Sequence, residues 1–134
     1  MKVFVDTSAF YASFTPDDLH HVAAAETLHQ LVKDSAELVT TNYVILECAS
    51  LVQRRKGYAY AERFVAEAHK DLRVIWVDET LHQRAFSIWK KEARKELSLV
   101  DCASFAAMRH AGIRKALAFD SHFAEHEFEV IPYR

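Results

Sequence analysis

The sequence has few of the features that would place it outside the class of small globular domains. Its only two cysteines, Cys48 and Cys102, each lie in an apolar, helix-like segment, so we expect buried free thiols and not a disulfide scaffold. No apolar run approaches the roughly 18 residues that a membrane-spanning helix requires. The first residues, MKVFVDTS, lack the apolar region and cleavage site of a signal peptide. We therefore expect a soluble, cytoplasmic protein without membrane contact.

An excess of positive charge is also missing. Lys and Arg number 17 against 19 Asp and Glu, which gives a net charge of -2, so the chain as a whole does not resemble a strongly basic nucleic-acid binder. Any such binding must depend on local patches. The 134 residues contain no repeat, low-complexity stretch or linker, and we expect one domain over residues 1–134.

Apolar strand-like runs alternate with segments of helical periodicity along the chain. This alternation predicts an α/β fold, a single three-layer domain in which a mostly parallel five-stranded sheet is flanked by helices. Because crossovers between parallel strands are right-handed, we expect the first strand to lie beside the fourth. Gly57 and Gly112 are expected to end helices, and Asn42, after TT, is expected to cap one. Ala85, Ile88 and Trp89 are expected to form a buried helical face. The predicted strands are 2–5, 38–41, 73–77, 116–119 and 129–131.

Aspartates follow two of these predicted strands, in VFVDTSAF and in ALAFDSHF. Asp6 and Asp120 could each simply cap the helix that follows. Their strands are predicted neighbours, however, and ligands of such sheets bind beyond the carboxyl ends of the strands where the order reverses. Asp78 also follows a strand, but that strand is expected at the remote edge, so we interpret Asp78 as the cap of a helix that begins at Glu79.

Two further acids fall in predicted helices. Glu47 is the only charge in YVILECASLV and lies on or beside the buried face, unless it reaches water at the rim. Asp101 follows Ser98 at the spacing of a capping box, which by itself explains a carboxylate there. If these two acids join Asp6 and Asp120, their mutual repulsion requires bound protons or a cation. Oxygen ligands favour a hard cation, Mg²⁺ or Mn²⁺.

These segments together resemble the PIN-domain family and, within it, the VapC-like ribonuclease toxins of toxin–antitoxin systems. The resemblance covers essentially the whole chain and depends on the order and spacing of its motifs. The matching segments are VDTSAFYA, DDLHH, TTNYVILE, LSLVDCASFAAMRHAGI and ALAFDSHF.

The resemblance implies a Mg²⁺- or Mn²⁺-dependent endoribonuclease that hydrolyses RNA phosphodiester bonds. It also implies a homodimer and a cognate antitoxin whose tail covers the acidic groove. The family commonly has Thr or Ser two places before its last aspartate, where this chain has Ala118. The implied catalytic and metal-binding acids are Asp6, Glu47, Asp101 and Asp120, supported by Thr7 or Ser8, Asn42 and Ser98.

Basic residues near helix ends are candidates for contacts to the RNA backbone, because phosphate binding supplies affinity that is independent of sequence. The candidates are Arg54, Arg55, Lys91 and Arg94, with Lys56, Lys90 and Lys95 beside them. Solvated helix ends are the simpler interpretation of each one.

Three other functions compete with a toxin. A stand-alone PIN nuclease and a non-catalytic PIN-like binding module would share these motifs. A phosphorelay receiver domain, which also binds Mg²⁺, would use Asp78 as phosphate acceptor, but DSHF offers no lysine where a receiver requires one.

Overall fold

The computed structural model of the protein describes residues 1–132 as an alternation of short strands and longer helices. No helix within these residues has both the length and the apolar character that crossing a membrane demands. The strands are β1 (Lys2–Val5), β2 (Glu37–Thr41), β3 (Arg73–Ile75), β4 (Lys115–Leu117) and β5 (Glu129–Ile131). The helices are α1 (Thr7–Phe14), α2 (His21–Lys33), α3 (Asn42–Lys56), α4 (Tyr58–Asp71), α5 (Glu79–Glu92), α6 (Leu99–Ala111) and α7 (His122–Glu125).

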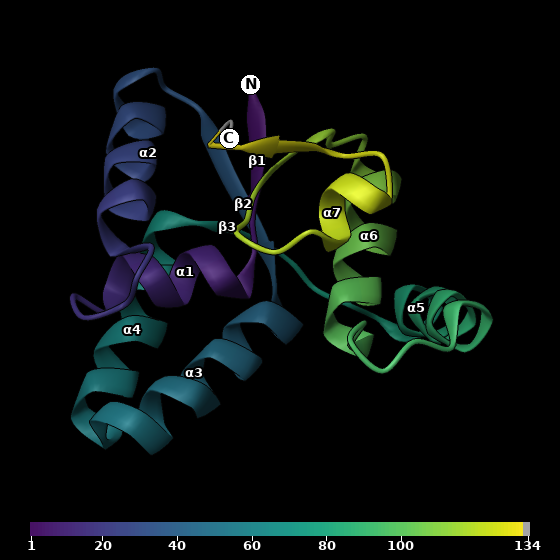
Figure 1. The fold of residues 1–134 in the computed structure, drawn as a ribbon, viewed down its shortest axis with the longest axis horizontal. Coiled ribbons are helices and arrows are strands. Elements are labelled where there is room, and N and C mark those ends of the chain that lie inside the picture. The colour runs from purple at the N-terminus through teal and green to yellow at the C-terminus, as the bar shows by residue number, and fades with distance from the viewer. Residues whose placement is uncertain (133–134) are drawn as a thin grey trace.

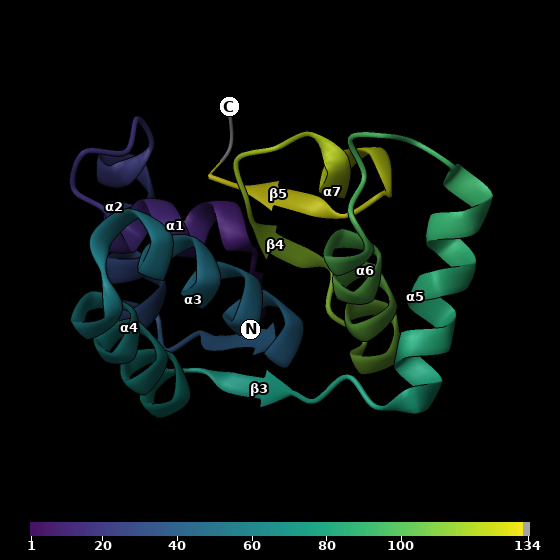
Figure 2. The ribbon, with the colours of Figure 1, turned by 90° about the horizontal axis from the view of Figure 1, so that it is seen from below.

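The five strands form one sheet in the order β3-β2-β1-β4-β5, and every neighbouring pair is parallel. Helices α1, α2 and α4 lie to one side of the sheet, and α5 and α6 lie to the other (Figure 1). The same separation is visible after a quarter turn (Figure 2). The predicted three-layer α/β fold is confirmed, as is the placement of the first strand beside the fourth.

The central strand β1 is apolar along most of its length, which makes it easy to predict from the sequence. Val3, Phe4 and Val5 of β1 are all fully buried, because a central parallel strand with helices on both faces has no solvent side. The ring of Phe4 lies 6.1 Å from that of Phe123, which in turn packs against Phe105 of α6. The aromatic cluster therefore fixes α6 and α7 to the carboxyl half of the sheet, where the predicted acids are located.

The two cysteines are buried free thiols, as expected. Burial in apolar surroundings raises the pKa of Cys48 to about 12 and that of Cys102 to about 11. Both side chains therefore behave as small apolar groups of α3 and α6 and have little thiolate character at neutral pH.

Helix ends agree with the sequence except at α3. Gly57 and Gly112 follow α3 and α6, and Gly112 has the left-handed φ of 69° that a helix end favours in glycine. Asp78 caps α5, accepting a hydrogen bond from the Leu81 amide at 2.9 Å. The prediction that Asn42 caps α3 is wrong, because the hydroxyl of Thr41, one residue earlier, accepts the hydrogen bond from Val44 N–H.

Two features differ from prediction, the end of β4 and the exposure of Trp89. Strand β4 ends at Leu117, so Asp120 lies in the following loop and not at the strand end. Trp89 is exposed and does not share the buried face that Ala85 and Ile88 form towards the core. Leu81, Ala85 and Ile88 form the stripe of α5 that packs inwards, and Trp89 lies at the edge of this stripe with 41% of its surface exposed.

Candidate metal centre

Three of the four predicted acids meet at the carboxyl edge of the sheet. Asp6 directly follows β1, Asp101 lies in the first turn of α6, and Asp120 lies in the loop after β4. One carboxylate oxygen from each lies within 4.8 Å of one from each of the others. Residues separated by more than 110 positions in the chain therefore form one acidic cluster, which we call the Asp6–Asp101–Asp120 cluster.

Asp6 is the most deeply buried member, with 2% of its surface exposed. Its Oδ2 accepts hydrogen bonds from the hydroxyl of Ser8 at 2.7 Å and from the backbone N–H of Ser8 at 3.2 Å. Burial and, after it, the charge of Asp120 raise the pKa of Asp6 well above its ordinary value, although the Ser8 hydrogen bonds oppose the shift. A buried carboxylate in this position is strongly stabilised by any cation that reaches it.

Asp101 combines the capping role predicted from the sequence with membership of the cluster. Its backbone N–H donates to Ser98 Oγ at 3.0 Å, and its Oδ2 accepts from Ser98 N–H at 3.1 Å, which completes the capping box. Burial raises the pKa of Asp101, and the charge of Asp120 raises it further, whereas the hydrogen bond from Ser98 lowers it. The cap therefore holds the carboxyl group in place without neutralising it.

Asp120 is held by the backbone, since its Oδ1 accepts a hydrogen bond from the N–H of His122 at 3.0 Å. Ala118, at the place where a supporting hydroxyl was expected, is fully buried. Ser8 instead reaches this loop, because its hydroxyl accepts a hydrogen bond from Phe119 N–H at 3.0 Å while donating to Asp6. One serine thus connects the segment after β1 to the loop that carries Asp120.

The three aspartates share a pattern of hydrogen bonding. Each uses one oxygen to accept a backbone N–H: that of Ser8, of Ser98 or of His122. Within residues 1–132, the second oxygen of each carboxylate has no hydrogen-bond donor. Three fixed carboxylates with free oxygens and two raised pKa values form a donor set that fits a hard divalent cation.

The remaining predicted site residues differ in their surroundings. Glu47 is half-buried on α3, which packs against both α1 and α6, but it is not a member of the cluster. The Oγ1 atom of Thr7 is buried and has no hydrogen-bond partner among the described residues. Asn42, which the resemblance implied as a residue that orients the acids, accepts a hydrogen bond at Oδ1 from Val77 N–H at 2.6 Å and so fixes the chain after β3.

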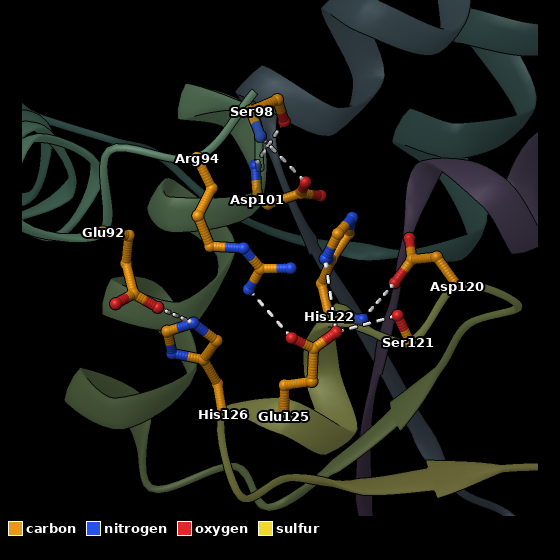
Figure 3. Close-up of polar contacts among 9 residues, drawn as sticks. All are labelled: Glu92, Arg94, Ser98, Asp101, Asp120, Ser121, His122, Glu125 and His126. Atoms are coloured by element: carbon orange, nitrogen blue, oxygen red, sulfur yellow. Dashed lines mark hydrogen bonds and ion pairs between the residues drawn. The ribbon is translucent and has the colours of Figure 1, made fainter. Parts of the chain in front are cut away.

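A second polar network, absent from the sequence-based expectations, adjoins the cluster. Figure 3 shows the imidazole ring of His122 between the carboxyl groups of Asp101 and Asp120. Nδ1 of His122 lies 3.8 Å from an oxygen of Glu125, and that same oxygen accepts a hydrogen bond from Ser121. The pairing of Asp120 with His122 at a two-residue spacing was the available signal, but only the tertiary fold brings His122 to Asp101.

Two of the predicted RNA contacts are engaged within the protein. Arg94 donates to Glu125 Oε2 at 2.8 Å, and Arg55 donates to the hydroxyl of Tyr11 at 3.0 Å with its guanidinium 5.3 Å from the ring centre. Arg54 and Lys91 are exposed and form no ion pair within residues 1–132.

Comparison with known proteins identifies relatives over nearly the full chain. The chain is 33% identical over 132 residues to the 23S rRNA-specific endonuclease VapC20 of Mycobacterium tuberculosis, covering 97% of this chain and 98% of the relative. It is 25% identical to a VapC ribonuclease of Archaeoglobus fulgidus, covering 92% and 80%.

Solved structures give the same result. The crystal structure of Mycobacterium tuberculosis VapC20, described as a sarcin–ricin loop cleaving toxin, superposes with a TM-score of 0.83 over 94% of this chain and 95% of that one, at 33% identity. VapBC2 of Rickettsia felis, solved with a promoter DNA fragment, shares the fold at 10% identity, with a TM-score of 0.72 and 97% of both chains covered. The model of the PIN domain matches residues 3–129. With this match over nearly the whole chain, the resemblance is confirmed, and the protein belongs to the PIN domain family.

Proposed function

We propose that the protein is a metal-dependent endoribonuclease and that the Asp6–Asp101–Asp120 cluster is its catalytic centre. The observation that carries this proposal is the convergence of three fixed carboxylates with free oxygens at one edge of the sheet. The relationship to ribonucleases at up to 33% identity supports RNA as the substrate class.

The residues of the cluster would hold Mg²⁺ or Mn²⁺. When bound, such an ion supplies a Lewis acid that polarises a phosphate oxygen and lowers the pKa of water. Ser8 and Ser98 keep Asp6 and Asp101 in position, and the backbone N–H of His122 does the same for Asp120. Glu47 is proposed as a fourth acid of the centre, at greater distance, and Thr7 as a hydroxyl close to it.

Of the alternative functions, the receiver domain fits the structure less well. A receiver domain would need Asp78 in the acidic pocket, but Asp78 follows the edge strand β3 and caps α5. A non-catalytic PIN-like module would retain the fold and metal binding without cleaving RNA. Activity separates that module from an enzyme.

Cleavage of a purified, end-labelled RNA tests the proposal. We expect cleavage with Mg²⁺ or Mn²⁺, none in EDTA, and recovery when metal is restored. Asp120→Asn should lower the rate by about a thousandfold, since the metal contributes several kcal/mol to transition-state stabilisation. If Asp120→Asn cleaves as fast as the parent, a contaminating nuclease accounts for the activity and the proposal fails.

We further propose that the protein is the toxin of a toxin–antitoxin pair that acts in the cytoplasm as a homodimer. The similarity to a relative described as a toxin supports this role. Expression in a host without a cognate antitoxin should arrest growth, and Asp120→Asn should abolish the arrest. Normal growth with active, abundant protein would favour a stand-alone nuclease.

A further inference from the structure

Two large aromatic side chains are exposed on α5. Phe86 and Trp89 are 43% and 41% exposed, and their ring centroids lie 6.3 Å apart. Leu81, Ala85 and Ile88 form the side of α5 that packs inwards, and neither aromatic side chain belongs to the hydrophobic core cluster. Burying these rings in the hydrophobic core is therefore not their role, and their exposed surface is free for another molecule.

The two rings line an open hollow of about 470 Å³ at the end of α5. The other residues that line it are Lys90, Ala93, Arg94 and Lys95. We call this surface the α5 hollow. Lys90 and Lys95, together with the adjacent Lys91, have no ion-pair partner within residues 1–132. The hollow thus presents flat aromatic surface together with uncompensated positive charge.

The α5 hollow is connected to the acid centre through side chains. Arg94 lines the hollow and donates to Glu125 at 2.8 Å. The other oxygen of Glu125 accepts from Ser121 at 2.8 Å, and Ser121 directly follows Asp120. Figure 3 shows Arg94 reaching towards Glu125 beside His122 and Asp120. The α5 hollow and the loop that carries Asp120 are therefore linked through the side chains of Arg94, Glu125 and Ser121.

We propose that the α5 hollow binds the single-stranded segment of RNA next to the cleaved bond. Bases stack on Phe86 and Trp89, and Lys90 and Lys95 contact phosphates. Single strands are bound in this way, by aromatic surfaces that accept any base and by cations that follow the backbone. A protein partner with an apolar surface would leave the three lysines uncompensated, whereas a polyanion neutralises them. The assignment rests on the proposed function and deepens it by locating the substrate strand.

The second tryptophan provides a matched control. Trp76 is 63% exposed and lines a different hollow with Asn42, Ile45, Leu46, Ala49, Val65 and His69, which contains neither lysine nor arginine. Because Trp76 and Trp89 are the only tryptophans, Trp76→Phe leaves emission from Trp89 alone, and Trp89→Phe leaves emission from Trp76 alone.

Fluorescence titration of both variants with a 12-nucleotide oligouridine, in EDTA to prevent hydrolysis, tests the proposal. We expect saturable quenching of Trp89 that weakens as salt is added, and no change at Trp76. Binding of a labelled oligouridine with no response from Trp89, or with equal responses from both tryptophans, would overturn the proposal. So would emission from Trp89 that depends on protein concentration without RNA, because a second copy would then cover the hollow.

Kinetics provide an independent test. The double variant Phe86→Ala/Trp89→Ala should raise KM for RNA by about a hundredfold, with little change in kcat, since each of the two lost stacking contacts costs about a factor of ten in affinity. Trp76→Ala should leave KM unchanged. An unchanged KM in the double variant contradicts the proposal. If the parent cleaves no RNA, the proposed function fails, and the titration in EDTA still decides whether the hollow binds RNA.

Discussion

Asp6 and Asp78 occupy equivalent places in their own segments and differ completely in their surroundings. Each follows a strand by one to three residues, and each accepts a backbone N–H at the start of a helix: that of Ser8 for Asp6 and that of Leu81 for Asp78. Asp6 is buried and faces two other carboxylates, whereas Asp78 is exposed at the edge of the sheet.

The difference shows that the helix cap alone does not make a site. Asp6 follows the central strand β1, whose neighbour β4 leads to Asp120, and α6 brings Asp101 to the same edge. Strand β3 has a single neighbour and no acid-bearing loop beside it. Position in the sheet therefore decides which capping aspartate becomes a candidate metal ligand, and variants of the two residues can test this distinction.

The largest expected effect is on stabilisation by metal. At a Mn²⁺ concentration a hundredfold above Kd, the parent should gain about 2.7 kcal/mol of folding free energy. Asp6→Asn should remove this gain, because it removes a charged ligand from the cluster. Asp78→Asn should retain it in full. Thermal denaturation of the three proteins with and without Mn²⁺ measures the effect, and an equal gain in all three would show that the metal binds elsewhere.

The next effect separates the hydroxyl that supports Asp6 from an ordinary serine of the same helix. Ser8→Ala should weaken Mn²⁺ binding by roughly ten- to a hundredfold, the usual cost of removing a group that orients a metal ligand. Ser13→Ala is the matched control, since the hydroxyl of Ser13 only donates to the carbonyl of Phe10. Calorimetric titration measures both affinities. Equal affinities would mean that Ser8 does not position Asp6.

A smaller effect, on stability alone, is expected from Asp78, which caps α5 and is not part of the acidic cluster. Asp78→Ala should lower the free energy of unfolding by about 1 kcal/mol, the typical value of an N-cap. It should leave the affinity for Mn²⁺ unchanged. Chemical denaturation and metal titration of the same sample measure both quantities. A loss of metal affinity in this variant would contradict the separation of the two aspartates.

The smallest effect is a change in the pH dependence of stability. The raised pKa of Asp6 means that the folded, metal-free protein binds more protons than the unfolded chain above the ordinary pKa of about 3.9. Its stability should therefore fall as pH rises from that value through the folded pKa. Mn²⁺ should oppose this fall, so that the stabilisation by metal grows with pH.

Variants test the origin of this trend. Asp6→Asn should flatten the metal-free pH profile, because it removes the carboxyl group with the raised pKa. Melting temperatures measured from pH 4 upwards, with and without Mn²⁺, provide the comparison. A steeper decline in Asp6→Asn than in the parent would contradict the assigned cause.

The sequence predicted the sheet and its order because the evidence for them is local. Buried strands such as Val3–Val5 are continuous apolar runs, and chain connectivity then limits their order. The grouping of Asp6, Asp101 and Asp120, together with Glu47, was implied by the resemblance to the PIN-domain family, and the structure brings the three aspartates together. From the residues alone, the sequence predicted that Asp6 and Asp120 follow neighbouring strands and that Asp101 caps a helix.

The errors lie where tertiary contacts select among locally equivalent residues. Thr41 and Asn42 are both residue types that commonly cap helices. In the structure Thr41 caps α3, whereas the side chain of Asn42 accepts a hydrogen bond from Val77 N–H. The position of His122 beside Asp101 depends on the turn of chain after β4. Likewise, Ile88 and Trp89 are adjacent large side chains on α5, and the sequence does not say which of them packs against the core.

Because all three aspartates satisfy backbone groups as well as forming the cluster, selection for folding and selection for activity act on the same codons. A descendant of this gene that had lost its nuclease activity would still be under pressure to retain them. Their presence in a related sequence is therefore weak proof of activity, and the surrounding residues that serve no structural need are better markers of a working enzyme.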